Sequence, residues 1–299
     1  MDESTKDDDV DAVAEGEVSP EAAQDEAAPS ANEDENTSAT EADEPELAEP
    51  EPVAASNGSG EVLIEAIDLV KHYGPIKAVD GISFSARRGD ILGFMGPNGA
   101  GKTTAMRIIT GFLTPDSGSV TVCGHEMGSS SLAGRQRIGY LPENAPAYAE
   151  MTVTGFLEFI AEAREVTDGG AIDRVIGMAE LKRVAHQTID TLSKGYKRRV
   201  GLAQALIHDP EVLILDEPTD GLDPNQKAVV QDLISNLSAG KCIVVSTHIL
   251  DEVERICNRA MIISQGRLLV DSTPGELIER SPTGRLDDFF REITQGVSR

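Results

Sequence analysis

Residues 96–104 read Gly96-Pro97-Asn98-Gly99-Ala100-Gly101-Lys102-Thr103-Thr104, and the first eight match the pattern G-x-x-x-x-G-K-[ST]. The apolar run Ile91–Met95 precedes them as an expected strand, and Lys102–Phe112 follows as an expected helix. The glycines let backbone amides converge on phosphate oxygens, and the positive end of the helix adds to the attraction. Lys102 would reach the β- and γ-phosphates of a nucleotide, and the Thr103 hydroxyl would ligate Mg²⁺. The alternative, a glycine-rich turn with a solvated lysine, is disfavoured by this strand and helix context.

An acidic pair follows a second apolar run, Val212–Leu215. This run predicts a buried strand, which would carry Asp216 to the carboxyl edge of a sheet beside the phosphate-binding loop. Asp216 is then placed to hold Mg²⁺, directly or through water, and Glu217 to polarise a water for attack on the γ-phosphate. The alternative is an Asp-Glu pair that only ends a strand before Pro218. The phosphate-binding loop upstream favours the catalytic interpretation.

A histidine, His248, follows a third apolar run, Ile243–Val245, after Ser246 and Thr247. From the end of a strand beside the phosphate site, its ring could hydrogen-bond the γ-phosphate and the attacking water. A lone histidine is more often an ordinary surface or core residue. Its position between a strand and a helix is what favours a catalytic role.

Short β-branched runs alternate with helical stretches after residue 60, which predicts an α/β fold with a mainly parallel sheet. The other expected strands are Val62–Val70, Val120–Cys123, Ile138–Leu141 and a hairpin of Ala260–Ile263 with Leu268–Val270. The other expected helices are Phe156–Ala163, Ala171–Ala185, Tyr196–Ile207, Gln226–Leu237 and Leu250–Arg259. Residues 145–210 read almost wholly helical, and we interpret them as an inserted subdomain. A hairpin and a closing helix would end the domain, over residues 259–299.

The first 60 residues differ from the rest in composition. They hold 20 Asp and Glu against one Lys, a net charge of −19 out of −26, with a single leucine and no isoleucine or aromatic residue. Such a segment cannot bury enough apolar surface to offset its ordering entropy, so residues 1–60 are predicted to be a disordered acidic tail and linker. The remaining residues, 61–299, would form one domain. The composition excludes a membrane-spanning protein, a disulfide scaffold and a basic nucleic-acid binder.

A third motif, Leu192-Ser193-Lys194-Gly195-Tyr196, resembles the L-S-G-G-Q signature of ABC ATPases. Other segments then fall into the order of that family. Tyr73 resembles the aromatic residue that stacks on adenine, and Asp220-Gly221-Leu222-Asp223 resembles the loop that crosses the dimer interface. The resemblance covers roughly residues 61–295. It implies a P-loop NTPase core with a mainly parallel sheet, an N-terminal antiparallel β element and an inserted α-helical subdomain.

The resemblance also implies a head-to-tail homodimer with ATP and Mg²⁺ between the phosphate loop of one subunit and the signature of the other. Ser193 and the Gly195 backbone lie at a helix start, so they could meet the γ-phosphate from the far side. Asp223 would lie beside the nucleotide at the same interface. Neither surface is then a complete site alone, and hydrolysis would let the two subunits separate.

The sequence departs from the family pattern at three positions. Lys194 and Tyr196 replace the first glycine and the glutamine of the signature, and Glu143 replaces the usual glutamine of Gly139-Tyr140-Leu141-Pro142-Glu143-Asn144. A carboxylate at position 143 would still favour Mg²⁺, so Glu143 joins Thr103 and Asp216 as an expected metal ligand. These variants and the C-terminal segment Leu286–Thr294 resemble the export-type bacterial branch that includes gliding-motility and nitrous-oxide-associated ATPases.

The function expected from this resemblance is an ATP-hydrolysing transporter subunit, cytoplasmic and peripheral on the cell membrane. It would energise a separately encoded polytopic permease, of which a cytoplasmic helix would dock near Glu143–Met151. Two alternatives stay open: a soluble ABC ATPase of translation or DNA maintenance, and an ATP-dependent interaction module whose hydrolysis has decayed. The basic run Lys197-Arg198-Arg199 is expected to be a solvated or salt-bridged helix face, and no nucleic-acid partner is expected.

Overall fold

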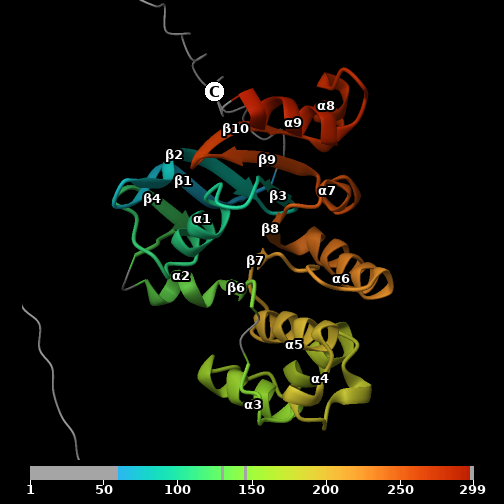
Figure 1. Ribbon diagram of the computed structural model, residues 1–299. Coiled ribbons are helices and arrows are strands. Elements are labelled where there is room, and N and C mark those ends of the chain that lie inside the picture. The colour runs from blue at the N-terminus through green and yellow to red at the C-terminus, as the bar shows by residue number, and fades with distance from the viewer. Residues whose placement is uncertain (1–59, 129–130, 145–146, 297–299) are drawn as a thin grey trace, which may run out of the picture. The chain divides into compact units, whose positions relative to one another are not determined.

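The computed structural model describes residues 60–128, 131–144 and 147–296, so residues 1–59 of the predicted acidic tail lie outside the described residues. A six-stranded sheet has the strand order β10-β9-β3-β8-β7-β6 (Figure 1). Its strands are β3 (Ile91–Met95), β6 (Ile138–Leu141), β7 (Val212–Asp216), β8 (Cys242–Thr247), β9 (Arg259–Ser264) and β10 (Arg267–Ser272). Neighbouring strands run parallel, except that β10 pairs antiparallel with β9. The predicted α/β class with a mainly parallel sheet is confirmed.

A second, antiparallel sheet has the order β2-β1-β4-β5. Its strands are β1 (Val62–Tyr73), β2 (Ile76–Arg87), β4 (Ser117–Val122) and β5 (His125–Glu126). Strand β2 was not among the expected strands, because its buried residues do not alternate throughout. Val79 is buried, and then Ile82, Phe84 and Ala86, so the parity changes at Gly81, where φ is +81° and the register with β1 shifts.

Nine α-helices complete the described part of the chain. They are α1 (Lys102–Ile109), α2 (Leu132–Gln136), α3 (Val153–Ala163), α4 (Ala171–Met178), α5 (Lys194–Leu206), α6 (Pro224–Leu237), α7 (Leu250–Ile256), α8 (Pro274–Arg280) and α9 (Leu286–Gly296). Short 3₁₀ turns occur at Lys182–Val184, Ile189–Thr191 and Ser238–Gly240. None of the described helices is both long and apolar enough to cross a membrane.

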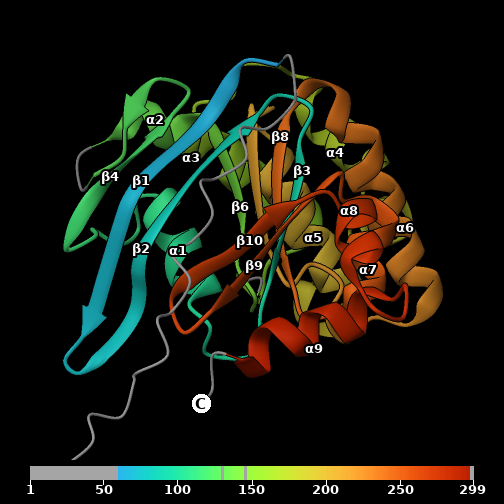
Figure 2. The same ribbon diagram turned by 90° about the horizontal axis from the view of Figure 1, so that it is seen from above.

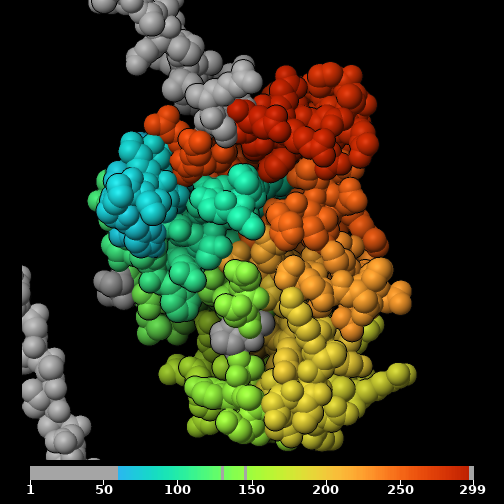
Figure 3. Space-filling model, in the orientation of Figure 1, coloured from blue at the N-terminus to red at the C-terminus, as the bar shows by residue number. Residues whose placement is uncertain are grey.

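Three expected helices end at least three residues early, and two short helices were not expected. Helix α1 ends before Phe112 because Gly111 has a φ of +71°, and α4 ends before Ala185 because Glu180 has a φ of +52°. Helix α7 ends at Ile256 because Cys257 is already extended. The short helices α2 and α8 are the additions. Between β6 and β7 the described residues form helices and turns, with Thr152 and Thr188 as an isolated bridge. Figures 1 and 3 show α3 and α4 at the end of the domain opposite α8 and α9.

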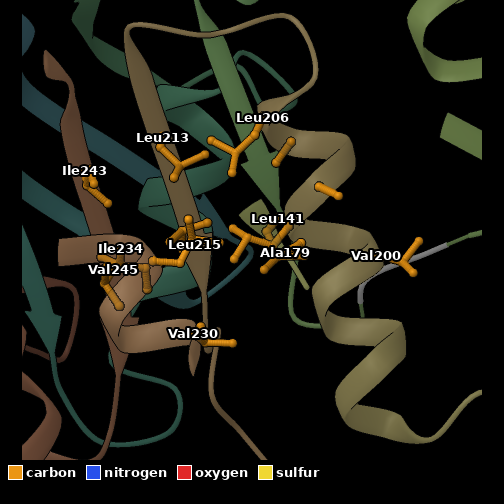
Figure 4. Close-up of a cluster of buried hydrophobic side chains, with 14 of the residues drawn as sticks. Leu141, Ala179, Val200, Leu206, Leu213, Leu215, Val230, Ile234, Ile243 and Val245 are labelled. Atoms are coloured by element: carbon orange, nitrogen blue, oxygen red, sulfur yellow. The ribbon is translucent and has the colours of Figure 1, made fainter. Parts of the chain in front are cut away.

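The core lies on both faces of the six-stranded sheet, and the two-residue period of the strands divides it. Val212 and Ile214 of β7 pack in the cluster that contains α1, which Figure 2 shows between the two sheets. Leu213 and Leu215 pack on the other face, against side chains of α5 and α6 (Figure 4). The sheet is therefore covered on both faces, and its carboxyl edge is where functional loops can be exposed.

Candidate active site

The phosphate-binding loop connects β3 to α1, as its sequence predicts. Gly101 is the N-cap of α1 with a φ of +107°, and a Cβ there would lie 2.1 Å from the carbonyl oxygen of Ala78 in β2. Only glycine satisfies both the conformation and the close approach. No side chain caps α1, so the amides at the start of the helix, including those of Thr103 and Thr104, can be offered to a phosphate. Pro97, Asn98 and Gly99 form the exposed tip of the loop.

The turn of the β9–β10 hairpin holds this loop through backbone hydrogen bonds. The amide of Gly266 donates to the carbonyl of Ala100 at 2.9 Å, and the carbonyl of Gly266 accepts from the amide of Asp80 at 2.8 Å. Arg267 in turn forms an ion pair of 2.9 Å with Asp80, which lowers the pKa of that carboxyl. The loop is thus fixed between β2 and the hairpin before any ligand binds.

Lys102 is only 7% exposed, and its ammonium donates to the carbonyl oxygens of Gly96 at 2.6 Å and Pro97 at 3.3 Å. Burial lowers the pKa of Lys102, whereas the charges of Glu217, Asp216 and Glu143 act to raise it. Three carboxylates predicted from two segments of the chain therefore act on one buried lysine. A nucleotide phosphate would give this ammonium the strong anionic partner that it otherwise lacks.

Asp216 ends β7 and is 1% exposed. The hydroxyl of Ser246, from the neighbouring strand β8, donates to its Oδ1 oxygen. The other oxygen, Oδ2, is buried with no hydrogen-bond partner. A buried carboxylate oxygen without a donor is costly, and a bound cation would satisfy it. Ser246 was missed by the sequence analysis, although its place two residues before His248 could have indicated it.

Glu217 follows Asp216 with a φ of +50°, a strained conformation for a residue with a side chain. Its amide donates to both the carbonyl (3.2 Å) and the hydroxyl (3.1 Å) of Ser246, which holds that conformation in place. The Nδ1 atom of His248 lies 3.0 Å from the carboxylate Oε2 of Glu217. Burial raises the pKa of Glu217 from its ordinary value of 4.5, and the contact with His248 acts to lower it. The structure thus brings the two predicted catalytic side chains into contact.

The signature segment begins helix α5. Ser193 is the exposed N-cap of α5, and its hydroxyl accepts from the amide of Tyr196 at 3.4 Å. Lys194 reaches over the next loop to pair with Asp220 at 3.0 Å. A Cβ on Gly195 would overlap the side chain of Gln226 in α6. The signature and the loop that ends at Asp223 are therefore in contact within one chain.

The other predicted site residues lie on three further segments, among them Glu143, whose charge acts on Lys102. Asp223 is the N-cap of α6, where its side chain accepts from the amides of Asn225 and Gln226. Glu143 lies in the exposed loop after β6. Tyr73 ends β1 on the antiparallel sheet and is 47% exposed. An exposed ring on that sheet remains free to stack on a base.

The basic run of α5 corrects one expectation. Arg198 and Arg199 are buried, with 4% and 6% exposure, so the expected solvated face is wrong. The salt-bridged alternative holds for Arg199, which pairs with Glu180 at 3.5 Å. Arg198 donates to backbone carbonyls of Pro142 and Pro218, among others, and so reaches both the loop after β6 and the loop after β7. Its position on α5 gave no sequence signal for this contact, because burial of the helix face depends on distant segments.

Comparisons with known proteins agree with this geometry. The family model described as ABC transporter matches residues 79–220. The "Nod factor export ATP-binding protein I" of Burkholderia orbicola is 37% identical over 220 residues, which are 72% of each chain. The "Probable multidrug ABC transporter ATP-binding protein YbhF" of Escherichia coli is 35% identical over 233 residues, 77% of this chain. The matched part of this chain spans 40% of that relative's length.

A solved structure titled "Structure of ATP binding subunit of ABC transporter" superposes with a TM-score of 0.71 and 28% identity. The alignment covers 78% of this chain and 99% of the other. Phosphate-binding loop, Asp-Glu strand and signature thus occur here in a chain whose sequence and fold both match one group of proteins. The chain belongs to the family of ABC transporter ATP-binding proteins.

Proposed function

We propose that this chain is an ATP-hydrolysing subunit that energises a transporter. One observation carries the proposal: the buried ammonium of Lys102, the unpartnered oxygen of Asp216 and the Glu217–His248 pair occur together at one sheet edge. Together they supply a cation for the phosphates, an oxygen for a metal and a base for water. The family and the export-type relatives support coupling of this reaction to transport.

Magnesium fits the residues at this edge. The free oxygen of Asp216, the hydroxyl of Thr103 and the carboxylate of Glu143 are the hard oxygen ligands that Mg²⁺ prefers. When bound, the ion would neutralise charge that develops on the β- and γ-phosphates. Ser246 would orient Asp216 toward it, because the hydroxyl occupies the other carboxylate oxygen.

Glu217 and His248 would act on the attacking water. The carboxylate of Glu217 accepts the water's proton as attack begins, and the raised pKa of this group makes it a better base than an ordinary glutamate. His248 holds that carboxylate through its 3.0 Å contact and is half exposed, so one edge of the ring can reach the γ-phosphate. The hydrolysis-impaired alternative is disfavoured because both groups are present and in contact.

The rate of hydrolysis is expected to fall in acid at a pH above the usual range for a glutamate. The base works only as a carboxylate, so activity is lost as the pH falls through the raised pKa of Glu217. His248→Ala removes the contact that lowers this pKa, so the acid limb should move to still higher pH, in addition to any loss of kcat. Measurement of kcat between about pH 5 and pH 9 checks both expectations. An acid limb that stays in place or moves to lower pH would contradict the assigned contact.

The active form would be a dimer with two nucleotides. Ser193 and Gly195 lie at the start of α5, whereas Lys102 begins α1, and neither helix start is expected to enclose a triphosphate alone. A second copy turned head to tail would place its helix start opposite the phosphate loop, where its dipole favours an anion.

The membrane partner would be a separate polytopic permease. A cavity of about 310 Å³ opens where the ends of α1 and α3 meet α2 and β6, and the exposed ring of Phe112 lines it. Tyr148 and Phe159 are also exposed, and their rings meet edge to face with centroids 5.4 Å apart. Exposed aromatic residues of this kind are typical of an interface. Docking of the permease at these exposed aromatic residues would hold the chain on the cytoplasmic face of the membrane.

A photo-reactive amino acid at Phe159 tests the transporter assignment. In membranes of the native organism, irradiation should join the chain to a protein with several membrane spans. The matched control places the same group at Ile67, which is similarly exposed on β1, and should give no such product. Equal products from both positions, or only soluble proteins from Phe159, would favour the soluble ABC ATPase.

A further inference from the structure

In the part of the chain that the structure describes, the buried guanidinium of Arg198 donates all of its hydrogen bonds to backbone carbonyls. Its Nε donates to Pro218 at 3.2 Å, one terminal nitrogen to Pro142 at 2.9 Å and to Glu143, and the other to Asp216 and Glu217. Five carbonyl oxygens thus match the full set of guanidinium N–H donors. Within the described residues it forms no ion pair. A guanidinium held by carbonyls alone fixes the orientation of peptide groups.

These carbonyls belong to the two loops that carry the proposed chemistry. Pro142 and Glu143 follow β6, Asp216 ends β7, and Glu217 and Pro218 follow it. Because a peptide group is planar, holding a carbonyl also fixes the amide of the next residue. Glu217 has a φ of +50°, a strained conformation for a residue with a side chain, so its backbone needs such restraint.

The neighbouring Arg199 provides a contrast on the same helix. It is equally buried, but its guanidinium lies over the ring of Tyr196 at 4.3 Å and contacts Ala179 and Glu180 at 3.4–3.5 Å. All of these residues lie between β6 and β7, in the helical part of the chain. Arg199 therefore packs the helices together, whereas Arg198 connects α5 to the sheet edge.

We propose that Arg198 is a positioning residue, which holds the Glu143 and Glu217 backbones in register with the signature helix α5. The proposal rests on the function proposed above and deepens it. The same helix that presents Ser193 to a second subunit would hold, five residues later, the loop that carries the base. A change in the tilt of α5 would then displace Glu217 directly, because the guanidinium is rigid and multiply bonded.

The test compares Arg198→Lys and Arg198→Gln with Arg199→Lys. A lysine keeps the charge but cannot reach both loops at once, and a glutamine avoids an unpaired buried charge. For either Arg198 variant we expect kcat to fall by about 10- to 100-fold, the scale of a displaced catalytic group. The KM for ATP and the Kd for a fluorescent ATP analogue should stay within about threefold. Arg199→Lys should keep its kcat and lower only the thermal unfolding temperature.

Amide hydrogen exchange of the nucleotide-free protein gives an independent measurement. Residues 217–220 and 141–144 should both exchange faster in Arg198→Gln and not in Arg199→Lys. Wild-type kcat retained in Arg198→Gln, or unchanged exchange in both segments, would overturn the positioning role while the hydrolysis proposal stands. Parallel loss of nucleotide affinity and of the folding transition would also overturn it, in favour of a purely structural role. A wild-type protein that does not hydrolyse ATP would refute the proposed function, and exchange would still decide the role of Arg198.

Discussion

Glu217→Gln is expected to bind ATP normally and to hydrolyse it on the order of 10²–10⁴ times more slowly than the wild type, the usual contribution of a positioned base. The amide keeps the size of the side chain and can still contact His248, so the loop geometry should persist. It cannot accept a proton from water at the pH of the assay. Hydrolysis should therefore stop after binding, and ATP should hold the two subunits together.

The measurement is phosphate release with Mg²⁺ present, together with the elution volume of each protein in ATP and in ADP. Glu217→Gln should elute as a dimer in ATP only. Glu254→Gln is the matched control, since it makes the same chemical change on the exposed face of α7 and should leave both readouts unchanged. If Glu217→Gln hydrolysed ATP at the wild-type rate, the base would be another group.

The part of the site that the sequence predicts lies at the ends of apolar runs. Asp216 ends a buried strand, and Lys102 and His248 each follow one. Parallel strands bring their carboxyl ends to one edge. The local sequence pattern, together with the rule that parallel strands end at one sheet edge, was therefore sufficient to predict these three residues. The signature was found in another way, through its resemblance to a family, since nothing in its own composition indicates a phosphate.

The residues that escaped prediction depend on contacts between distant segments. Strand β2 was hidden by the parity change at Gly81, and its importance comes from Ala78, against which Gly101 packs. Arg198 looked like a surface cation because helix periodicity alone does not show which distant loops cover a face. Its partners lie about 20 and 55 positions away along the chain. These contacts form only in the folded structure, where the loops after β6 and β7 both lie beside α5.

If the site is divided between two subunits as proposed, two variants that are each inactive should restore activity when they are mixed. Lys102→Ala removes the phosphate cation, and Ser193→Arg replaces the exposed hydroxyl of the signature with a bulky side chain. Each variant alone spoils both sites of a head-to-tail dimer. A mixed dimer has one site that combines both defects, and another that combines the intact Lys102 of one chain with the intact Ser193 of the other.

Equal amounts of the two variants should therefore recover about a quarter of the wild-type rate, because half of the random dimers are mixed and each has one intact site of two. The recovered rate should rise with protein concentration, as expected of dimer assembly. Lys102→Ala mixed with Lys102→Ala,Ser193→Arg is the control and should stay inactive, since no intact site can form. A mixture that shows only the sum of the separate residual rates would mean that Ser193 does not complete a site across the interface. The contact of the signature with Asp220 and Gln226 within one chain would then be its whole role.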